Sequence, residues 1–299
     1  MEKCNKNVWI DLEYNGIQIK FRVTSLNDLL MPQIWCDIEN RQFLPIALHS
    51  TVCDVFNTPK IIKVRMGISK NLIAQFPSIT EIDHLSEGTY WRRIRADGSA
   101  LEELLKRVKI NHSLNINTLV KFDSNSPILS VDHLKIASGF HMTREDLFNF
   151  SGKSGMFWCT HKLKNDDLID FVKRWLKGSN TKLESLYLAN QTNGPSFDKE
   201  KILEQFDTKP WDPKRRDGRF MYSKNAVRWQ SDIDILDCTQ QLDIEREHDG
   251  LLATIIVTEK LFCFFVWHTP FAKPGNNLPV MAKSNPNELP KYYLGSVVY

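Results

Sequence analysis

Histidine and cysteine residues in the middle of the chain are the first candidates for chemistry, because both residue types bind transition metals. They are His133, His141, Cys159 and His161. Structural zinc sites use closely spaced pairs of such ligands. These residues have no tight pair spacing, and they fall on separate expected elements. We therefore interpret them as ordinary core and loop residues, and we expect no metal.

A group of aspartates is a second candidate, in this case for a hard cation. Asp232, Asp234 and Asp237 lie close together in the sequence. A calcium loop also needs a glycine at its sharp turn and a distal glutamate. This segment has neither, so we interpret the aspartates as the solvated edge of a strand.

Basic and aromatic residues between 209 and 220 form the third candidate. A tryptophan that stacks and arginines that clamp could hold a nucleic acid or a phosphorylated peptide. The alternative, which we favour, is that the arginines pair with an acidic strand expected at 243–247. Isolated basic turns on a nearly neutral protein are usually solvated. The candidate partner-binding residues are Trp211, Lys214, Arg215, Arg216 and Arg219.

Catalytic motifs with a known mechanism are missing from the sequence. It has no Gly-x-Ser-x-Gly elbow, no phosphate-binding loop and no Gly-x-Gly-x-x-Gly segment. An isolated Ser, His or Asp is not evidence of catalysis without geometry. We predict that the chain is not an enzyme and needs no cofactor.

The composition is that of a soluble protein with a substantial core. The chain has 299 residues, of which 42% are hydrophobic and 25% charged, and its net charge of +3 is too small to indicate attraction to nucleic acid or membrane. Its 6 cysteines show no Cys-x-x-Cys spacing, and the N-terminus has no apolar signal segment. We expect reduced thiols and a cytoplasmic or nuclear location.

An amphipathic helix followed by a strand is the clearest local pattern. Asn165 is the expected N-cap of a helix at 166–177, and Gly178 is the expected left-handed stop. A Leu-rich strand should follow at 183–188. The expected structural core comprises Leu168, Phe171, Trp175, Leu186, Leu188 and Trp267.

Similar strand–helix units recur before this one. The predicted strands are 116–122, 131–136 and 156–160, with a short helix at 143–150. This pattern favours a short, irregular leucine-rich-repeat-like arc in a mixed α/β fold. Upstream of it, the predicted elements are a hairpin of 8–14 with 17–23 around Asn15-Gly16, a strand at 60–66 and a helix at 99–108.

The C-terminal third is expected to be an antiparallel hairpin or meander of strands at 241–246, 251–258 and 261–268. The last two are continuous apolar runs, so both of their faces need cover. We expect them to pack against the repeat helices and to seal one end of the arc. The turn at 248–250 should be exposed and tolerant of substitution, except that Gly250 should need a positive φ.

Three segments of this sequence resemble a known family. The run from Lys164 to Asn180 with Leu183–Leu188 resembles the core of the nematode F-box-associated domain, type 2. The basic Trp-Asp-Pro segment at 210–216 is similar to one in that family, and 243–268 resembles its closing hairpin. The resemblance is strong from about 125 to 268 and weaker from 8 to 124. We expect an N-terminal α/β region at 1–110 and, as the resemblance implies, an F-box-associated domain at 111–270. The prolines and the lack of periodicity beyond it predict a Pro-rich tail at 271–299.

The resemblance implies a role in protein recognition. In that family an F-box docks onto the adaptor of a cullin-based ubiquitin ligase, and the associated domain is thought to hold the substrate. We find no F-box in this sequence, so it is either truncated or a member that lost the docking module. We expect a protein–protein interaction module that binds the adaptor only if an F-box lies upstream, and that does not co-purify with it alone. The alternative is a nucleic-acid or phosphopeptide binder.

Overall fold

The computed structural model describes most of the chain between residues 9 and 268. The described ranges are 9–14, 16–25, 32–36, 44–57, 63–66, 80–87, 95–117, 119–136, 142–158, 162–190, 194–223, 226 and 235–268. The chain divides into two compact units, Met1–Ile62 with Ser69–Thr80, and Lys63–Ile68 with Glu81–Tyr299. The expected tail at 271–299 lies outside the described residues.

The first unit contains a three-stranded antiparallel sheet and one helix. Tyr14 pairs with Ile17, and Gly16 has a φ of 77°, which confirms the expected tight hairpin. The core of the unit is formed by Ile19, Phe21, Leu44 and Ala47. The elements are β1 (Trp9–Tyr14), β2 (Ile17–Ser25), β3 (Pro32–Cys36) and α1 (Leu44–Val55).

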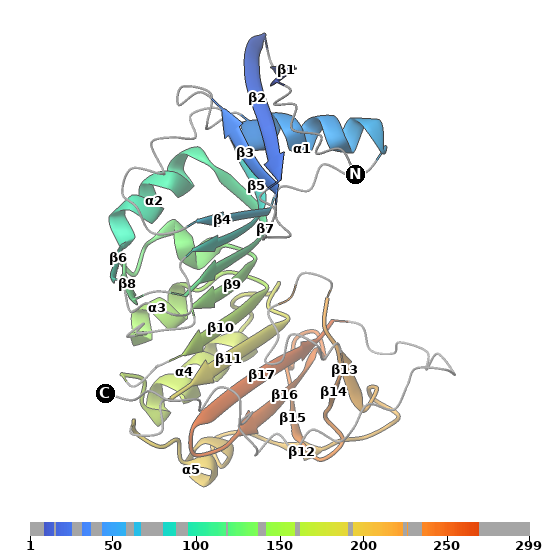
Figure 1. Ribbon diagram of the computed structural model, residues 1–299. Coiled ribbons are helices and arrows are strands. Elements are labelled where there is room, and N and C mark those ends of the chain that lie inside the picture. Colours follow the sequence, from blue (N-terminus) through green and yellow to red (C-terminus); the bar gives the residue numbers. More distant parts are fainter. Residues whose placement is uncertain are drawn as a thin grey trace. The chain divides into compact units, whose positions relative to one another are not determined.

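The second unit is built on a mixed sheet that has ten strands among the described residues (Figure 1). One half is parallel, in the order β11, β10, β9, β7, β5 and β4, and the other is antiparallel, in the order β17, β16, β15 and β12. The parallel strands are β4 (Lys63–Met66), β5 (Glu81–Glu87), β7 (Lys109–Ile116), β9 (His133–Ile136), β10 (Ser154–Trp158) and β11 (Ser185–Ala189). The antiparallel strands are β12 (Lys209–Pro210), β15 (Leu242–Glu245), β16 (Leu252–Val257) and β17 (Leu261–Trp267).

Helices and two small strand pairs complete this unit. The pairs are β6 (Arg95–Asp97) with β8 (Leu119–Lys121), and β13 (Arg219–Met221) with β14 (Ile235–Asp237). The helices are α2 (Gly98–Arg107), the 3₁₀ helix η2 (Pro127–Ser130), α3 (Arg144–Asn149), α4 (Asn165–Leu176) and α5 (Lys199–Leu203). None of the helices in the described ranges is long and apolar enough to cross a membrane.

The strand of the large sheet near residue 115 lies earlier in the chain than predicted, at Lys109–Ile116. The large sheet uses β7, and the segment predicted as its strand, 116–122, instead supplies the short β8 that pairs with β6. Every second residue from 110 to 116 is apolar except His112, the others being Ile110, Leu114 and Ile116. The polar histidine interrupts this alternation, so the strand was not recognised from the sequence. The expected domain boundary at 110/111 consequently falls inside β7.

The start of α4 also differs from the prediction. Lys164, not Asn165, is the N-cap, and its backbone N–H donates to the Asp167 carboxylate at 2.8 Å. Asn165 begins the helix, and its side-chain oxygen accepts the backbone N–H of Asp198 at 3.1 Å. The cap is therefore a reversed one, in which a first-turn carboxylate satisfies the N-cap N–H. Gly178 ends the helix with a φ of 96°, as expected.

The C-terminal hairpin continues the sheet instead of sealing an end of it. Strand β17 pairs antiparallel with β11, with Leu186 opposite Phe264. Side chains of adjacent residues on β17 point to opposite faces. Phe264 meets Trp175 of α4 edge-on at 5.1 Å, whereas Phe265 packs on Phe220 of β13 at 4.9 Å. Both faces of β17 are thus covered, as its apolar run requires.

Candidate functional site

Arg216 lies at the centre of the basic segment, and its side chain is fully buried. Its Nε and Nη2 groups donate to the two Asp243 carboxylate oxygens at 2.7 and 2.9 Å. Further N–H groups reach the backbone oxygens of Asp217 at 2.7 Å and Cys238 at 3.1 Å. A buried charge is tolerated only when it is paired and hydrogen-bonded in this way. Arg216 therefore faces the interior and not a partner.

The other candidate contact residues of the segment are largely occupied as well. Arg215 pairs with Glu245 at 2.7 Å, and Arg219 lies 3.8 Å from Asp217. The Trp211 indole N–H donates to the Arg216 carbonyl at 3.2 Å. The side chain of Lys214 is exposed. The arginines at 215 and 216 thus pair with β15, as the favoured interpretation of the sequence required.

The buried pair and a nearby glycine hold β13 over the sheet. The Cys238 N–H donates to the Gly218 carbonyl at 2.7 Å, which anchors the chain just before β13. A Cβ at residue 218 would lie 2.4 Å from Thr239 Cγ2 and 3.1 Å from Trp211 Cζ2. Only glycine allows this close approach without displacement of a neighbour. The backbone of β13 is therefore fixed by contacts on both sides.

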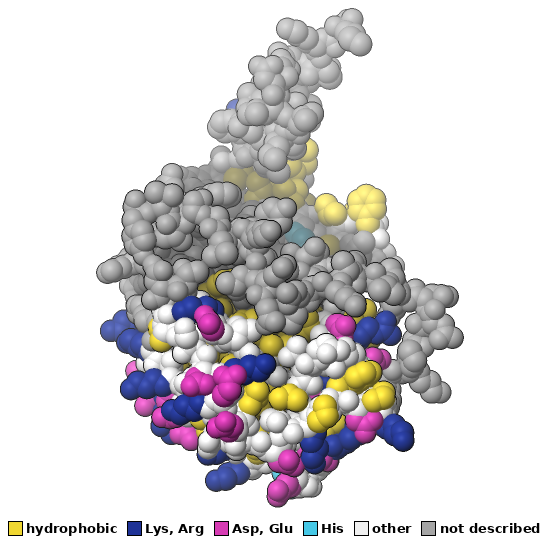
Figure 2. All heavy atoms as spheres, turned by 90° about the horizontal axis from the view of Figure 1, so that it is seen from below, with side chains coloured by type: hydrophobic (Ala, Val, Ile, Leu, Met, Phe, Trp, Pro, Cys, Tyr) yellow, Lys and Arg dark blue, Asp and Glu magenta, His cyan; other side chains and the backbone are white. Residues whose placement is uncertain are grey.

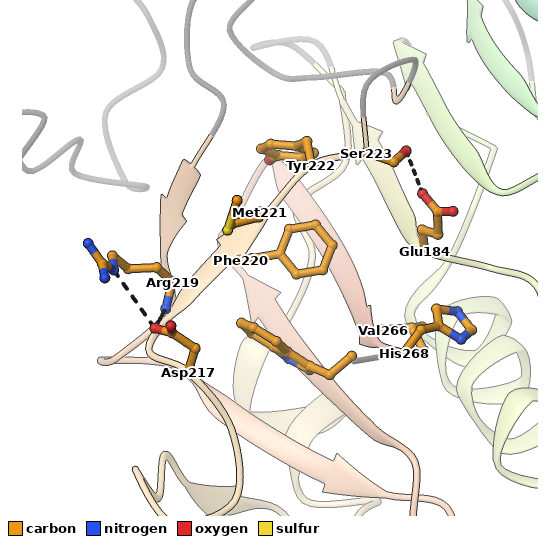
Figure 3. A pocket seen from close by; sticks show the side chains of 10 residues that line it. Glu184, Asp217, Arg219, Phe220, Met221, Tyr222, Ser223, Val266 and His268 are labelled. Atoms are coloured by element: carbon orange, nitrogen blue, oxygen red, sulfur yellow. Dashed lines mark hydrogen bonds and ion pairs between the residues drawn. The ribbon is translucent and has the colours of Figure 1, made fainter. Parts of the chain in front are cut away.

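A pocket of about 300 Å³ lies beside β13, where this strand passes the ends of β11 and β17 (Figure 3). We call it the β13 pocket. We call its buried lining residues Phe220 and Trp267, which are 6% and 7% exposed, the floor, and its exposed residue Met221, at 54%, the rim. Its lining residues are Glu184, Asp217, Arg219, Phe220, Met221, Tyr222, Ser223, Val266, Trp267 and His268.

Rigid aromatic packing supports the floor of the β13 pocket. The Phe220 ring centroid lies 4.9 Å from that of Phe265, 5.2 Å from Trp267 and 5.3 Å from Tyr222. The contacts with Trp267 and Tyr222 are edge-to-face, the geometry that aromatic rings prefer. Arg216 lies 4.4 Å from the Trp267 ring centroid, so the buried ion pair also supports this floor.

The polar groups of the pocket stand at its two ends. Ser223 donates its hydroxyl to Glu184 Oε2 at 2.7 Å, and the His268 Nε2–H donates to the Leu183 carbonyl at 2.7 Å. At the other end, the Arg219 backbone N–H donates to Asp217 Oδ1 at 3.0 Å. The lining therefore carries two carboxylates and one guanidinium, and its net charge is negative.

A second and larger hollow, of about 590 Å³, lies beside the C-terminal end of α4. Its charged groups are mixed in sign and partly pair with one another. Lys209 lies 3.4 Å from Asp207 and 3.9 Å from Glu245. The described part of the face in Figure 2 likewise shows basic and acidic side chains interspersed. Both the hollow and the described part of this face carry positive and negative side chains together, so their charge does not select one class of ligand.

The metal candidates are not assembled by the described residues. His133 hydrogen-bonds through Nδ1 to the Ser154 hydroxyl at 2.8 Å. Burial lowers the pKa of His133, and Glu184 and Asp132 oppose this effect. Within the described ranges, no group of three potential ligands is close enough for a metal ion. Lying outside the described residues are His141, Cys159, His161, Asp232 and Asp234.

Asp237 and the described cysteines have structural surroundings. Asp237 accepts the Thr239 backbone N–H at 2.9 Å and its hydroxyl at 2.8 Å. Burial raises the pKa of the Cys238 thiol to about 12, so it holds its proton at neutral pH. The free thiols among the described residues are Cys36, Cys53, Cys238 and Cys263.

The expected core residues are all buried. Trp175 is only 1% exposed and packs against Phe264 of β17. The other five expected core residues are likewise buried, namely Leu168, Phe171, Leu186, Leu188 and Trp267. Trp267 also contributes to the floor of the β13 pocket, so one core residue has a second, surface-directed role.

Sequence reasoning missed the residues that form the β13 pocket. Glu184 and Ser223 are 39 positions apart, and Glu184 and His268 are brought together only by the pairing of β11 with β17. The one local signal was the Phe-Met-Tyr run at 220–222, an aromatic and apolar segment directly after the basic turn. Such a run can be read as core as easily as rim, so it does not identify a site by itself.

Comparison with known proteins finds a family model that matches part of the chain. Residues 125–188 match the family model described as F-box associated. The chain is 34% identical over 181 residues to the uncharacterized protein F59B2.8 of Caenorhabditis elegans, an alignment that covers 58% of this chain and 39% of that protein. No solved structure matches the chain. The family match runs from η2 through β11 and includes Glu184 of the pocket.

Proposed function

We propose that this chain, whose residues 125–188 match the F-box-associated family model, is a protein-interaction module whose binding surface is the β13 pocket and its rim. The proposal is of binding and not of catalysis. The observation that carries it is a preformed pocket with an aromatic floor, polar ends and an exposed methionine at its edge. Pockets with this composition anchor side chains of partner proteins.

The position of Met221 supports a protein partner. Exposed methionine adapts its shape to different partners and is enriched at protein interfaces. Beside it, Phe220 and Trp267 are held rigidly, so little conformational entropy would be lost when a ligand binds to the floor. A flexible rim above a rigid floor suits a segment of a partner chain.

The first unit offers separate support for protein binding. Val52, Val55 and Phe56, at the end of α1, are 53%, 71% and 69% exposed. Contiguous exposed apolar groups are typical of protein interaction surfaces. We treat this surface by itself and assign no partner to it.

We further propose that the parallel strands with their helices form a leucine-rich-repeat-like arc that displays the pocket. Six strands, from β4 to β11, pair in parallel, and the helices α2 to α4 alternate with them in the chain. The distance in sequence between successive strands varies, so the repeat is irregular. Such an arc would present the ends of its strands as one continuous surface.

The proposed biological role is substrate recognition for a cullin-based ubiquitin ligase. It follows the role that the family resemblance implies, and it concerns only the region related to that family. The alignment spans 39% of the relative from C. elegans, so the activity of a whole protein of that kind is a separate proposal. The alternative, a nucleic-acid or phosphopeptide binder, would have to work without Arg216, which is buried against Asp243.

Photo-crosslinking through Met221 tests the proposed function. The full chain carrying benzoylphenylalanine at 221 is expressed in cells and irradiated, and the adducts are analysed by mass spectrometry. We expect a discrete protein adduct that an excess of unmodified chain suppresses. The control carries the same photoreactive residue at Lys121, an exposed position in β8. Adducts with nucleic acid alone, or the same adducts at both positions, would refute the proposal.

A further inference from the structure

We propose that the β13 pocket binds a basic side chain, lysine or arginine, presented by the protein partner. The inference rests on the proposed function and specifies the chemistry that the same site recognises. It depends on the placement of the charges around the pocket, and on the use that the chain already makes of its own cations nearby.

The two carboxylates of the pocket differ in their partners. Asp217 lies beside the Arg219 guanidinium, at 3.8 Å, and also accepts the Arg219 backbone N–H. Glu184 accepts the Ser223 hydroxyl, a neutral donor, at 2.7 Å. The nearby Lys153 is directed to Asp132, at 2.9 Å. Within the described ranges, Glu184 is therefore not in a contact ion pair with a Lys or Arg side chain, although its charge adds to the rise in the pKa of Lys153.

The floor of the pocket suits the aliphatic stem of a long basic side chain. Lysine and arginine pack their methylene groups on apolar surface and keep the charged end at a polar group. Here the ring of Phe220 would contact the stem, and Glu184 would receive the charged end (Figure 3). A short basic group such as histidine would not combine both contacts.

The buried arginine determines the end at which the cation binds. Arg216 already lies over the Trp267 ring, 4.4 Å from its centroid, with its charge paired to Asp243. A ligand cation cannot also use this face of the ring, whereas a cation near Glu184 gains an ion pair and a charge-assisted hydrogen bond. A phosphate or carboxylate group would lie against Glu184 at one end of the pocket or Asp217 at the other, so the pocket selects against acidic and phosphorylated side chains.

Methyl NMR on the full chain tests this proposal. The chain has 7 methionines, and the Met221 methyl group at the pocket rim can be assigned with Met221→Leu. The probes are the blocked amino acids N-acetyl-arginine amide and N-acetyl-lysine amide, with N-acetyl-citrulline amide as the neutral match of arginine. We expect a saturable Met221 shift with the two cations and none with citrulline. Met156, which is fully buried in the same hydrophobic cluster as Phe220, should shift far less than Met221 with every probe.

A charge-neutralising variant identifies the residue that selects the cation. Glu184→Gln keeps an acceptor for Ser223 and should weaken binding of the arginine probe about tenfold, since it removes a charge-assisted contact. Glu145→Gln on α3 removes an equal charge from an exposed position outside the pocket and should leave binding unchanged. An unchanged Met156 signal in both variants shows that the core is intact.

Several outcomes would overturn the inference. Equal shifts with citrulline, equal weakening by the two Gln variants, or preferential binding of N-acetyl-phosphoserine amide would each do so. If crosslinking at Met221 captures a protein while the basic probes fail, the interaction module stands and only the basic ligand is wrong. If the basic probes bind while no protein is captured, the proposed function fails and the chemistry of the pocket stands.

Discussion

Arg216 and Asp243 form an ion pair inside the protein, with 0% and 7% of their side-chain surfaces exposed. The Thr254 hydroxyl donates to the same carboxylate at 2.6 Å, and the Trp267 indole N–H donates to Thr254 at 2.8 Å. This network connects the loop before β13 with strands β15, β16 and β17. The basic segment that looked like a binding surface therefore serves mainly to hold the pocket in place.

Breaking this pair from one side should strongly destabilise the protein. Arg216→Met leaves the Asp243 charge buried without a partner, and Asp243→Leu does the same to Arg216. Each change should lower the free energy of unfolding by about 3–5 kcal/mol. The double variant should recover part of the loss, because two apolar side chains need no counter-charge. Urea unfolding of the four proteins measures the coupling between the two residues.

A surface pair provides the matched control for that series. Arg144 and Asp170 lie 2.6 Å apart, with 49% and 38% of their side chains exposed. Asp170→Asn should cost only about 0–1 kcal/mol, since solvent screens exposed pairs. If the effects of Arg216→Met and Asp243→Leu simply add in the double variant, the two residues do not act as a pair.

Trp175 is expected to stabilise the contact of α4 with the sheet. Its ring meets Phe264 of β17 edge-on at 5.1 Å, and Arg246 lies 4.8 Å from its centroid. Trp175→Ala should cost about 3–5 kcal/mol through the cavity it leaves. Trp175→Phe should cost clearly less, because it keeps most of the contact. Thermal melting followed by circular dichroism compares them, and a fully stable Trp175→Ala variant would contradict the core assignment.

Local periodicity explains which elements the sequence predicted well. The stripe of α4 and the runs of β16 and β17 depend on neighbours along the chain, so they were predicted almost in place. The apolar alternation of β7 was hidden by His112 and by flanking polar residues. The cap of α4 was misplaced by one residue because the Asp167 carboxylate accepts the N–H of Lys164, while the side chain of Asn165 accepts the N–H of Asp198 instead of capping the helix.

The site was harder to predict because its parts come from distant strands. The pairing of arginines with the acidic strand followed from charge alone, but which arginine is buried depends on the packing over Trp267. The pocket exists only because β17 pairs with β11, which brings the segments around residues 184 and 268 together. Nothing in the local pattern specifies that the hairpin extends the sheet. The order of strands that are far apart in the chain cannot be predicted from the local patterns of a single sequence.

The exposed turn at 248–250 should be less tolerant than its position suggests. The Asp249 carboxylate accepts the Arg246 Nη2–H at 2.6 Å. This hydrogen bond is the main reason why the pKa of Asp249 falls from 3.8 to about 2. A carboxylate with a depressed pKa stabilises the folded state above its unfolded pKa and loses this effect as the pH falls towards its folded pKa. Asp249→Asn should therefore be less stable than the parent at pH 6, with the difference vanishing between about pH 4 and pH 2.

Urea unfolding at several pH values measures that difference. His248→Gln serves as the control, because His248 lies 3.6 Å from the same carboxylate and contributes less to its pKa. It should keep most of the pH dependence, whereas Arg246→Met should abolish it. A constant difference between the parent and Asp249→Asn from pH 6 to pH 2 would show that the hydrogen bond with Arg246 has no net effect on folding.

The pairing of β11 with β17 makes the second unit dependent on its C-terminal strands. A chain that ends at residue 195 would lack β17 and expose the edge of β11 from Ser185 to Ala189, together with the apolar face of α4 that Phe264 covers. Exposed apolar edge strands pair with other chains and aggregate. We therefore expect this shortened chain to be insoluble or partly unfolded, as judged by size-exclusion chromatography and thermal melting. If it were monomeric and melted cooperatively, the parallel half of the sheet would be an independent folding unit, and β17 would be an addition to it.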